Sequence, residues 1–124
     1  LEKINSIILR LGGLISETRN PIYSLVKKDI IKLDGRINLI HQKECVSIVN
    51  KLIKKPFLNN IFNCVYPYHP SKKDYYENQA LLRNISLKKI VYSKKNEKTI
   101  KSNKISRYLN YTFKFDINSL KSDF

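Results

Sequence analysis

Hydrophobic side chains at every second position predict strands in several short stretches of the chain. The clearest stretch is residues 111–117, where aromatic and aliphatic residues alternate with Thr112, Lys114 and Asp116. This alternation is typical of a strand with one buried and one wetter face. The same period of two predicts strands over residues 4–11, 36–41, 61–66 and 85–92.

A helical period of three to four predicts three further segments. The first has the clearest start, with Asn20 as N-cap and Pro21 at the first helical position, where the missing donor of proline costs nothing. A helix is therefore expected over residues 21–33. The other helices are expected over residues 43–55 and 96–109.

The middle of the chain, residues 61–92, contains a stretch that a core cannot hold. Between its two strand-like ends, Pro67 and Pro70 remove backbone donors, and the charges of residues 72–74 are too close together to bury. We therefore expect residues 66–82 to project as a long two-stranded arm with a charged tip.

The predicted elements follow the order βαββαβ when the helix over residues 43–55 is treated as an insertion. This is the split βαβ, or ferredoxin-like, plan, an α+β fold whose helices cover one sheet face and leave the other for a partner. With 124 residues, the chain is expected to form one domain over residues 1–124, ending in a loosely held tail at residues 118–124.

The charge of the chain narrows the choice of partner. Lys and Arg number 24 against 10 Asp and Glu, a formal net charge of +14. Such a charge favours a polyanion, either nucleic acid or an anionic membrane surface. The longest apolar run, residues 7–15, is interrupted by Arg10 and is shorter than the ~20 residues that span a bilayer, so the chain is not expected to span a membrane.

Basic residues interleaved with aromatic ones around the predicted arm indicate an RNA-binding surface. Lysine ammonium groups neutralise phosphates, and aromatic rings stack on unpaired bases. The alternative interpretation of the same stretch is a solvated hairpin tip. The candidate RNA-binding residues are Tyr68, His69, Lys72, Lys73, Tyr75, Tyr76, Arg83, Lys88, Lys89, Lys94 and Lys95.

Catalytic and metal-binding chemistry has little support in the sequence. There is no Gly-rich phosphate loop and no recognisable nucleophile motif, so we expect no catalytic residues, no cofactor and no enzymatic activity. His41, Cys45, Cys64 and His69 would supply two cysteine and two histidine ligands for zinc, but their spacing matches no zinc motif. Lone cysteines on apolar stripes are usually small core residues, so neither a metal site nor a disulfide is expected.

Several residues before, within and after the predicted arm follow a pattern known from one family. They are Phe62, His69, Lys73, Asp74, Leu87, Ile90, Val91, Glu97, Lys98 and Thr99. At these positions the chain resembles the small-subunit ribosomal protein S-ten family (universal and NusE-like), of mitochondrial type. The resemblance implies the ferredoxin-like fold, a long hairpin that reaches into the head of the small subunit, and an inserted helix over residues 43–55.

The resemblance also implies a function. The protein would be a structural constituent of the small ribosomal subunit in translation, binding ribosomal RNA and neighbouring head proteins in the mitochondrial matrix, with no small-molecule substrate. Two other functions remain open from the charge and composition. One is an accessory subunit of a mitochondrial respiratory complex, and the other is a free nucleic-acid-binding regulator.

Overall fold

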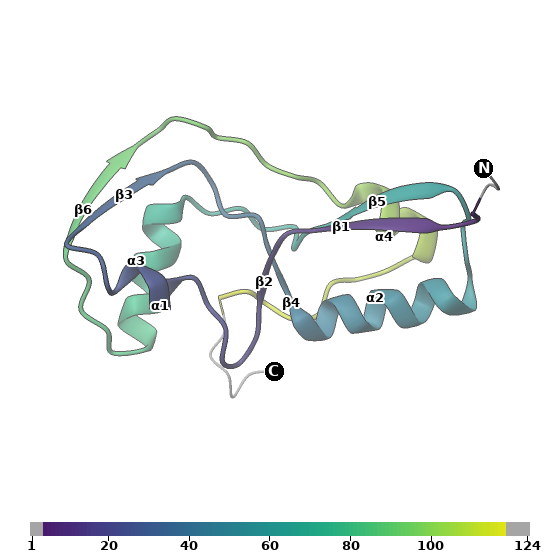
Figure 1. The fold of residues 1–124 in the computed structure, drawn as a ribbon, viewed down its shortest axis with the longest axis horizontal. Coiled ribbons are helices and arrows are strands. Elements are labelled where there is room, and N and C mark those ends of the chain that lie inside the picture. Colours follow the sequence, from purple (N-terminus) through teal and green to yellow (C-terminus); the bar gives the residue numbers. More distant parts are fainter. Residues whose placement is uncertain (1–3, 119–124) are drawn as a thin grey trace.

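Parallel strand pairs define the architecture, which a computed structural model describes for residues 4–118 (Figure 1). The paired strands are β1 (Ile7–Leu11) with β5 (Asn60–Cys64), β2 (Gly13–Ile15) with β4 (Leu39–His41), and β3 (Ile30–Asp34) with β6 (Lys89–Ser93). The helices are α1 (Ile22–Leu25), α2 (Gln42–Lys54), α3 (Lys72–Leu82) and α4 (Asn103–Leu109).

The ferredoxin-like prediction is wrong, because it rested on neighbouring strands joined by a hairpin arm. Hairpin-connected strands pair antiparallel, whereas parallel partners need a long crossover between them. Each pair observed here is parallel and joins strands that are far apart in the sequence. The chain is therefore an α+β structure built from two-stranded parallel sheets.

The arm predicted over residues 66–82 is largely a helix. Ser71 caps α3 by accepting a hydrogen bond from the backbone N of Asp74 at 3.1 Å. Asp74 lies in the first turn, where a negative charge favours the helix, and Tyr75 and Tyr76 are only 1% and 7% exposed. The charged residues thus face solvent while the adjacent tyrosines fill the core, so the protruding hairpin does not exist.

The helix predicted over residues 21–33 is only partly present. The Asn20 side chain does accept a hydrogen bond from the backbone N of Ile22 at 3.0 Å, but α1 ends after four residues. The second half of the segment forms β3, in which Ile31 and Leu33 are buried and Ile30 is 56% exposed. The apolar positions of this second half fit a helical period and a period of two, and pairing of β3 with β6 stabilises the strand.

The strand predicted over residues 111–117 belongs to none of the ladders. Its side chains alternate as expected, with Tyr111 and Ile117 buried and Lys114 exposed. A side chain rather than a neighbouring strand takes up its backbone donors: the carboxylate of Glu44 accepts hydrogen bonds from the backbone N of Lys114 and of Phe115. Of the tail predicted at residues 118–124, all but the first residue lies outside the described residues.

Two hydrophobic cores lie at opposite ends of the elongated molecule (Figure 1). One joins α1, α3, β3 and β6, and the other joins β1, β5, α2 and α4. The helix expected over residues 43–55 is present as α2 and supplies Ile48 and Leu52 to the second core. Its description as an insertion depended on the ferredoxin-like plan and the S-ten resemblance. None of the helices within residues 4–118 combines the length and apolarity needed to cross a membrane.

Candidate functional site

The carboxyl ends of β1 and β5 meet near the middle of the molecule, where ligands bind in many parallel α/β sheets. Gly12 leaves β1 directly and donates from its backbone N to Cys64 O at 2.9 Å. A Cβ atom at Gly12 would lie 2.8 Å from the backbone O of Asn38. Glycine is therefore needed for the chain to pass this closely from one sheet to the next.

An open hollow of about 480 Å³ lies beside these strand ends. Three cationic side chains, one amide and one hydroxyl contribute to its wall, and the wall contains no carboxylate. The lining residues are Arg10, Leu11, Asn63, Val65, Lys98, Thr99, Ile100 and Lys101. We call this set the basic hollow; its composition suits an anion such as a phosphate group.

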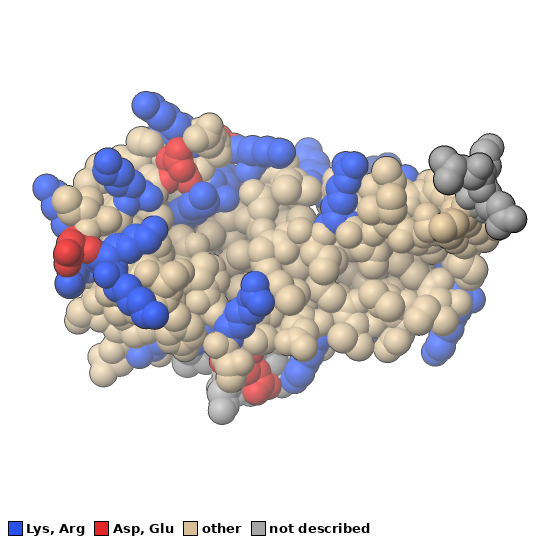
Figure 2. Space-filling model, viewed as in Figure 1, with Lys and Arg blue, Asp and Glu red and all other residues tan. Residues whose placement is uncertain are grey.

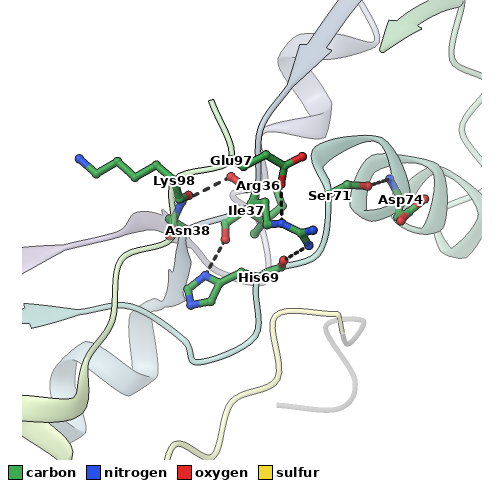
Figure 3. Close-up of polar contacts among 8 residues, drawn as sticks. All are labelled: Arg36, Ile37, Asn38, His69, Ser71, Asp74, Glu97 and Lys98. Carbon is green, nitrogen blue, oxygen red and sulfur yellow. Dashed lines mark hydrogen bonds and ion pairs between the residues drawn. The ribbon is translucent and has the colours of Figure 1, made fainter. Parts of the chain in front are cut away.

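The segment that carries the lysines of the basic hollow is held in place by side chains. Asn38 Nδ2 donates to Lys98 O at 3.0 Å (Figure 3). Asn38 Oδ1 accepts from the backbone N of Ile100 at 2.7 Å. Beyond it, the buried Ser102 hydroxyl donates to Val65 O at 2.8 Å and accepts from Val65 N at 2.6 Å. The wall is thus positioned against β5 and the entry to β4.

Arg36 ties three chain segments together next to this wall (Figure 3). Its Nε donates to the Glu97 carboxylate at 2.6 Å, and its Nη1 donates to the backbone O of His69 at 3.0 Å. The His69 ring in turn donates from Nδ1 to Ile37 O at 2.9 Å, since a carbonyl oxygen only accepts. Because Arg36 pairs with Glu97, the carboxylate nearest in sequence to Lys98 is already occupied, and the basic hollow keeps its positive charge.

A second hollow, of about 570 Å³, lies at the carboxyl ends of β2 and β4. It includes Glu17, Lys43 and Phe115, and its cation Lys43 is 3.6 Å from the Glu17 carboxylate. The two charges offset each other, so this hollow has no preference for an anion. The basic hollow is therefore the stronger candidate for a charged ligand.

The residues predicted to bind RNA are dispersed, and none of them lines the basic hollow. Tyr75 and Tyr76 were expected on an exposed arm but are buried, and burial raises the pKa of Tyr76 to about 12. Their rings therefore present no surface for stacking on bases. His69 is half-buried against Ile37 O.

Three of the predicted cations bond to other side chains instead. Lys73 is 3.2 Å from the Glu77 carboxylate, and Lys88 is 2.6 Å from that of Asp29. Arg83 donates to the Tyr23 hydroxyl at 2.8 Å. The remaining members of the set are the exposed Tyr68, Lys89, Lys94 and Lys95 and the half-buried Lys72.

The sequence interpretation missed the residues of the basic hollow because they come from distant parts of the chain. Arg10 was placed on one face of a predicted strand and Lys98 in a basic stretch after the predicted arm, and no local pattern connects the two residues. The one local signal was Gly12-Gly13 directly after a strand, which marks a close approach of backbone as well as a strand end.

The cysteines do not form a reactive or metal-binding centre in the part of the chain that the structure describes. Cys45 and Cys64 are free thiols, and burial raises the pKa of Cys64 to about 12. No group of three or more His, Cys, Asp or Glu side chains in residues 4–118 is placed to hold a metal ion.

Sequence relatives cover only part of the chain, and no family model matches it. The protein YeeZ of Escherichia coli strain K12 is 29% identical over 75 residues, which are 60% of this chain and 27% of YeeZ. The match thus spans about a quarter of that curated relative.

Solved structures share the fold at low sequence identity. RMD of Pseudomonas aeruginosa, complexed with NADPH, has a TM-score of 0.73 at 10% identity, covering 94% of this chain and 45% of its own. WbmG of Bordetella bronchiseptica, complexed with NAD and UDP, has a TM-score of 0.74 at 12% identity, covering 99% and 44%. UDP-glucuronic acid 4-epimerase of Bacillus cereus, complexed with UDP-glucuronic acid and NAD, has a TM-score of 0.69 at 13% identity, covering 94% and 43%.

This likeness identifies the fold as Rossmann-like with parallel strands, and it overturns the ribosomal interpretation. The S-ten resemblance is wrong, because it required the ferredoxin-like plan and the arm. The predicted role in translation, the ribosomal RNA and head-protein partners, and the lack of a small-molecule substrate depended on that resemblance and are wrong with it. The fold shared with NAD(P)-bound enzymes gives no support to the expectation of a non-enzyme. This chain spans less than half of each solved chain.

Proposed function

We propose that this chain provides the sugar-nucleotide-binding part of an NAD(P)-dependent enzyme of the epimerase or dehydratase type. The observation that carries the proposal is the basic hollow at the carboxyl ends of β1 and β5. It supplies cations and hydrogen-bond donors where parallel α/β folds bind ligands. Structures with the same fold were solved with UDP or UDP-glucuronic acid together with NAD, which supports a nucleoside diphosphate sugar as the ligand.

Each polar side chain of the basic hollow has a role in this proposal. Arg10, Lys98 and Lys101 form charge-assisted hydrogen bonds with the diphosphate oxygens, the strongest kind available to a phosphate. Asn63 and Thr99 donate from their amide and hydroxyl groups. Asn38 and Ser102 lie outside the ligand contacts and keep the lysine-bearing wall in position.

The residues present do not fit the dinucleotide itself. A Rossmann pyrophosphate site needs a G-x-G-x-x-G turn between a strand and a helix, whereas these 124 residues contain three glycines, Gly12, Gly13 and Gly35. The lining of the basic hollow also includes no carboxylate, histidine or thiol that would act as a general base. The proposal therefore assigns the basic hollow to binding and orienting the substrate, and it assigns no redox or proton-transfer step to its residues.

Calorimetric titration of the 124-residue chain with UDP and with uridine tests the proposal. UDP is expected to bind and uridine to bind much more weakly, because the diphosphate supplies the charged contacts. Lys98→Gln removes one such contact, so we expect roughly ten-fold weaker UDP binding. Lys89→Gln, an exposed lysine at the far end of the molecule, serves as the matched control. Equal affinity for UDP and uridine, or equal losses in the two variants, would refute the proposed site.

The mitochondrial location remains a prediction that the fold does not address. Fractionation of cells that express the native gene, with detection of the protein in the matrix, is the measurement that tests it.

A further inference from the structure

β1 leaves one edge of its sheet open. Within residues 4–118, β1 pairs with β5 alone. Gly12 N donates to Cys64 O and Asn59 N donates to Ser6 O, so the even-numbered residues of this segment bond to β5. By the alternation of a parallel ladder, Ile7, Leu9 and Leu11 direct their backbone N–H and C=O groups outward.

The other edge of the same sheet is blocked. On the outer side of β5, Lys104 Nζ donates to Ile61 O at 3.0 Å. A lysine placed on a sheet edge discourages the addition of another strand. The open edge of β1 is therefore the side on which this sheet can grow.

An apolar groove of about 320 Å³ runs between β1 and α2. Helix α2 has an inner stripe, Ile48 and Leu52, and a second stripe that faces outward. The outer stripe consists of Val46, Val49 and Ile53, which are 53%, 40% and 72% exposed. Figure 2 shows that charged side chains gather over the end formed by β3 and β6 and that few lie over β1 and α2.

The opposite face of the sheet is also incompletely covered. Ile8 and Ile61 are register partners, and they are 50% and 42% exposed. Parallel sheets in proteins are covered by helices on both faces, and two strands alone are too few for a stable sheet. The edge, the groove and this face together define an incomplete parallel α/β layer, which we call the open β1 surface.

We propose that the open β1 surface docks a dinucleotide-binding α/β unit that these 124 residues do not contain. A strand of that unit extends the sheet beside β1, one helix fills the groove against Val49 and Ile53, and another covers Ile8 and Ile61. The inference rests on the proposed function for the nature of the unit. Its size follows from the solved chains of the same fold, which are roughly twice as long as the part that this chain covers.

Site-specific photo-crosslinking in cells that express the native gene tests the docking. A photoreactive side chain at Ile53 is expected to crosslink to a peptide from a unit with a G-x-G-x-x-G turn, identified by mass spectrometry. The matched control is Leu81 on α3, which is 81% exposed but lies outside the open β1 surface. Crosslinks from Ile53 to the same helix of a second copy, to lipid, or at the level of Leu81 would overturn the proposal.

Hydrogen exchange provides a second measurement that does not depend on a crosslink. The backbone amides of Leu9 and Leu11 should exchange rapidly in the isolated chain and become protected in the native assembly. Ile53→Lys should weaken the association roughly ten-fold or more, and Leu81→Lys should not. Rapid exchange of both amides in the native assembly would refute docking at the β1 edge.

The two proposals fail separately. Ile53→Lys lies outside the basic hollow and should leave UDP affinity unchanged. If the chain does not bind UDP but Ile53 still crosslinks to the dinucleotide-binding unit, the proposed substrate site is refuted and the docking surface is supported. If the chain binds UDP but Ile53 gives no such crosslink, the docking surface is refuted and the substrate site is supported.

Discussion

Glu44 should be one of the most important single residues for the stability of this chain. Its side chain lies in the first turn of α2 and is fully buried. The carboxylate accepts hydrogen bonds from the Tyr111 hydroxyl, from Lys114 N at 2.8 Å and from Phe115 N at 3.2 Å. Glu44→Ala removes the acceptor for all three donors and detaches the C-terminal segment from α2.

The magnitude follows from these three contacts. A hydrogen bond to a charged group contributes about 1.5–3 kcal/mol, but the two backbone donors are only partly buried and regain water after the substitution. We therefore expect Glu44→Ala to lower the free energy of unfolding by about 3–5 kcal/mol, a large fraction of the roughly 5–15 kcal/mol of a typical domain. Glu44→Gln keeps a carbonyl acceptor and should cost about 2 kcal/mol.

Urea denaturation followed by circular dichroism measures these differences. The matched control is Glu97→Gln, because Glu97 also pairs with a neighbouring segment but its side chain is 37% exposed. An exposed ion pair contributes about 0–1 kcal/mol. If Glu44→Ala unfolds at the same urea concentration as Glu97→Gln, the carboxylate does not hold the C-terminal segment.

Three further outcomes are expected. Gly12→Ala should destabilise the fold and weaken UDP binding, since the new Cβ would lie 2.8 Å from Asn38 O; unchanged values in denaturation and titration would contradict the close approach. Burial raises the pKa of Tyr76 and of Tyr111 from 10.0 to about 12. Burial of these two neutral hydroxyls therefore leaves the free energy of unfolding unaffected below pH 10 and lowers it as the pH rises from 10 towards 12. An alkaline titration followed by circular dichroism that shows no loss of stability in this window would refute the expectation. The Cys64 thiol, whose pKa is raised to about 12 by burial, should resist alkylation at neutral pH until the protein is denatured, whereas rapid labelling of the native chain would show that it is accessible.

Local patterns in the sequence predicted several elements well. The apolar stripe around Ile48 and Leu52 predicted α2, and the alternation around Leu9 and around Phe62 predicted β1 and β5. Each of these segments carries one periodicity only, so the local pattern and the final fold agree. The alternation at residues 111–117 likewise predicted which side chains are buried, although not what binds their backbone.

The errors arose where one stretch suited two structures. Charges beside Tyr75 and Tyr76 were taken as the tip of an arm, because the pattern does not show that a helix can turn the charges outward and the tyrosines inward. The second half of residues 21–33 fitted a helix and a strand, and pairing of β3 with β6 favoured the strand there. The S-ten pattern included Lys73 and Asp74, and it therefore reinforced the interpretation of this stretch as an arm.

The sequence by itself determined the net charge, the main helix α2, the strands β1 and β5, and the absence of a Gly-rich loop from these 124 residues. Only the tertiary structure decided that the strands pair in parallel and that Arg10, Asn63 and Lys98 surround one hollow. It alone shows the role of Glu44 and the unpaired edge of β1. The physical reason is that periodicity reports which face of a segment is buried, whereas strand direction and long-range partners depend on how the crossovers bring distant segments together.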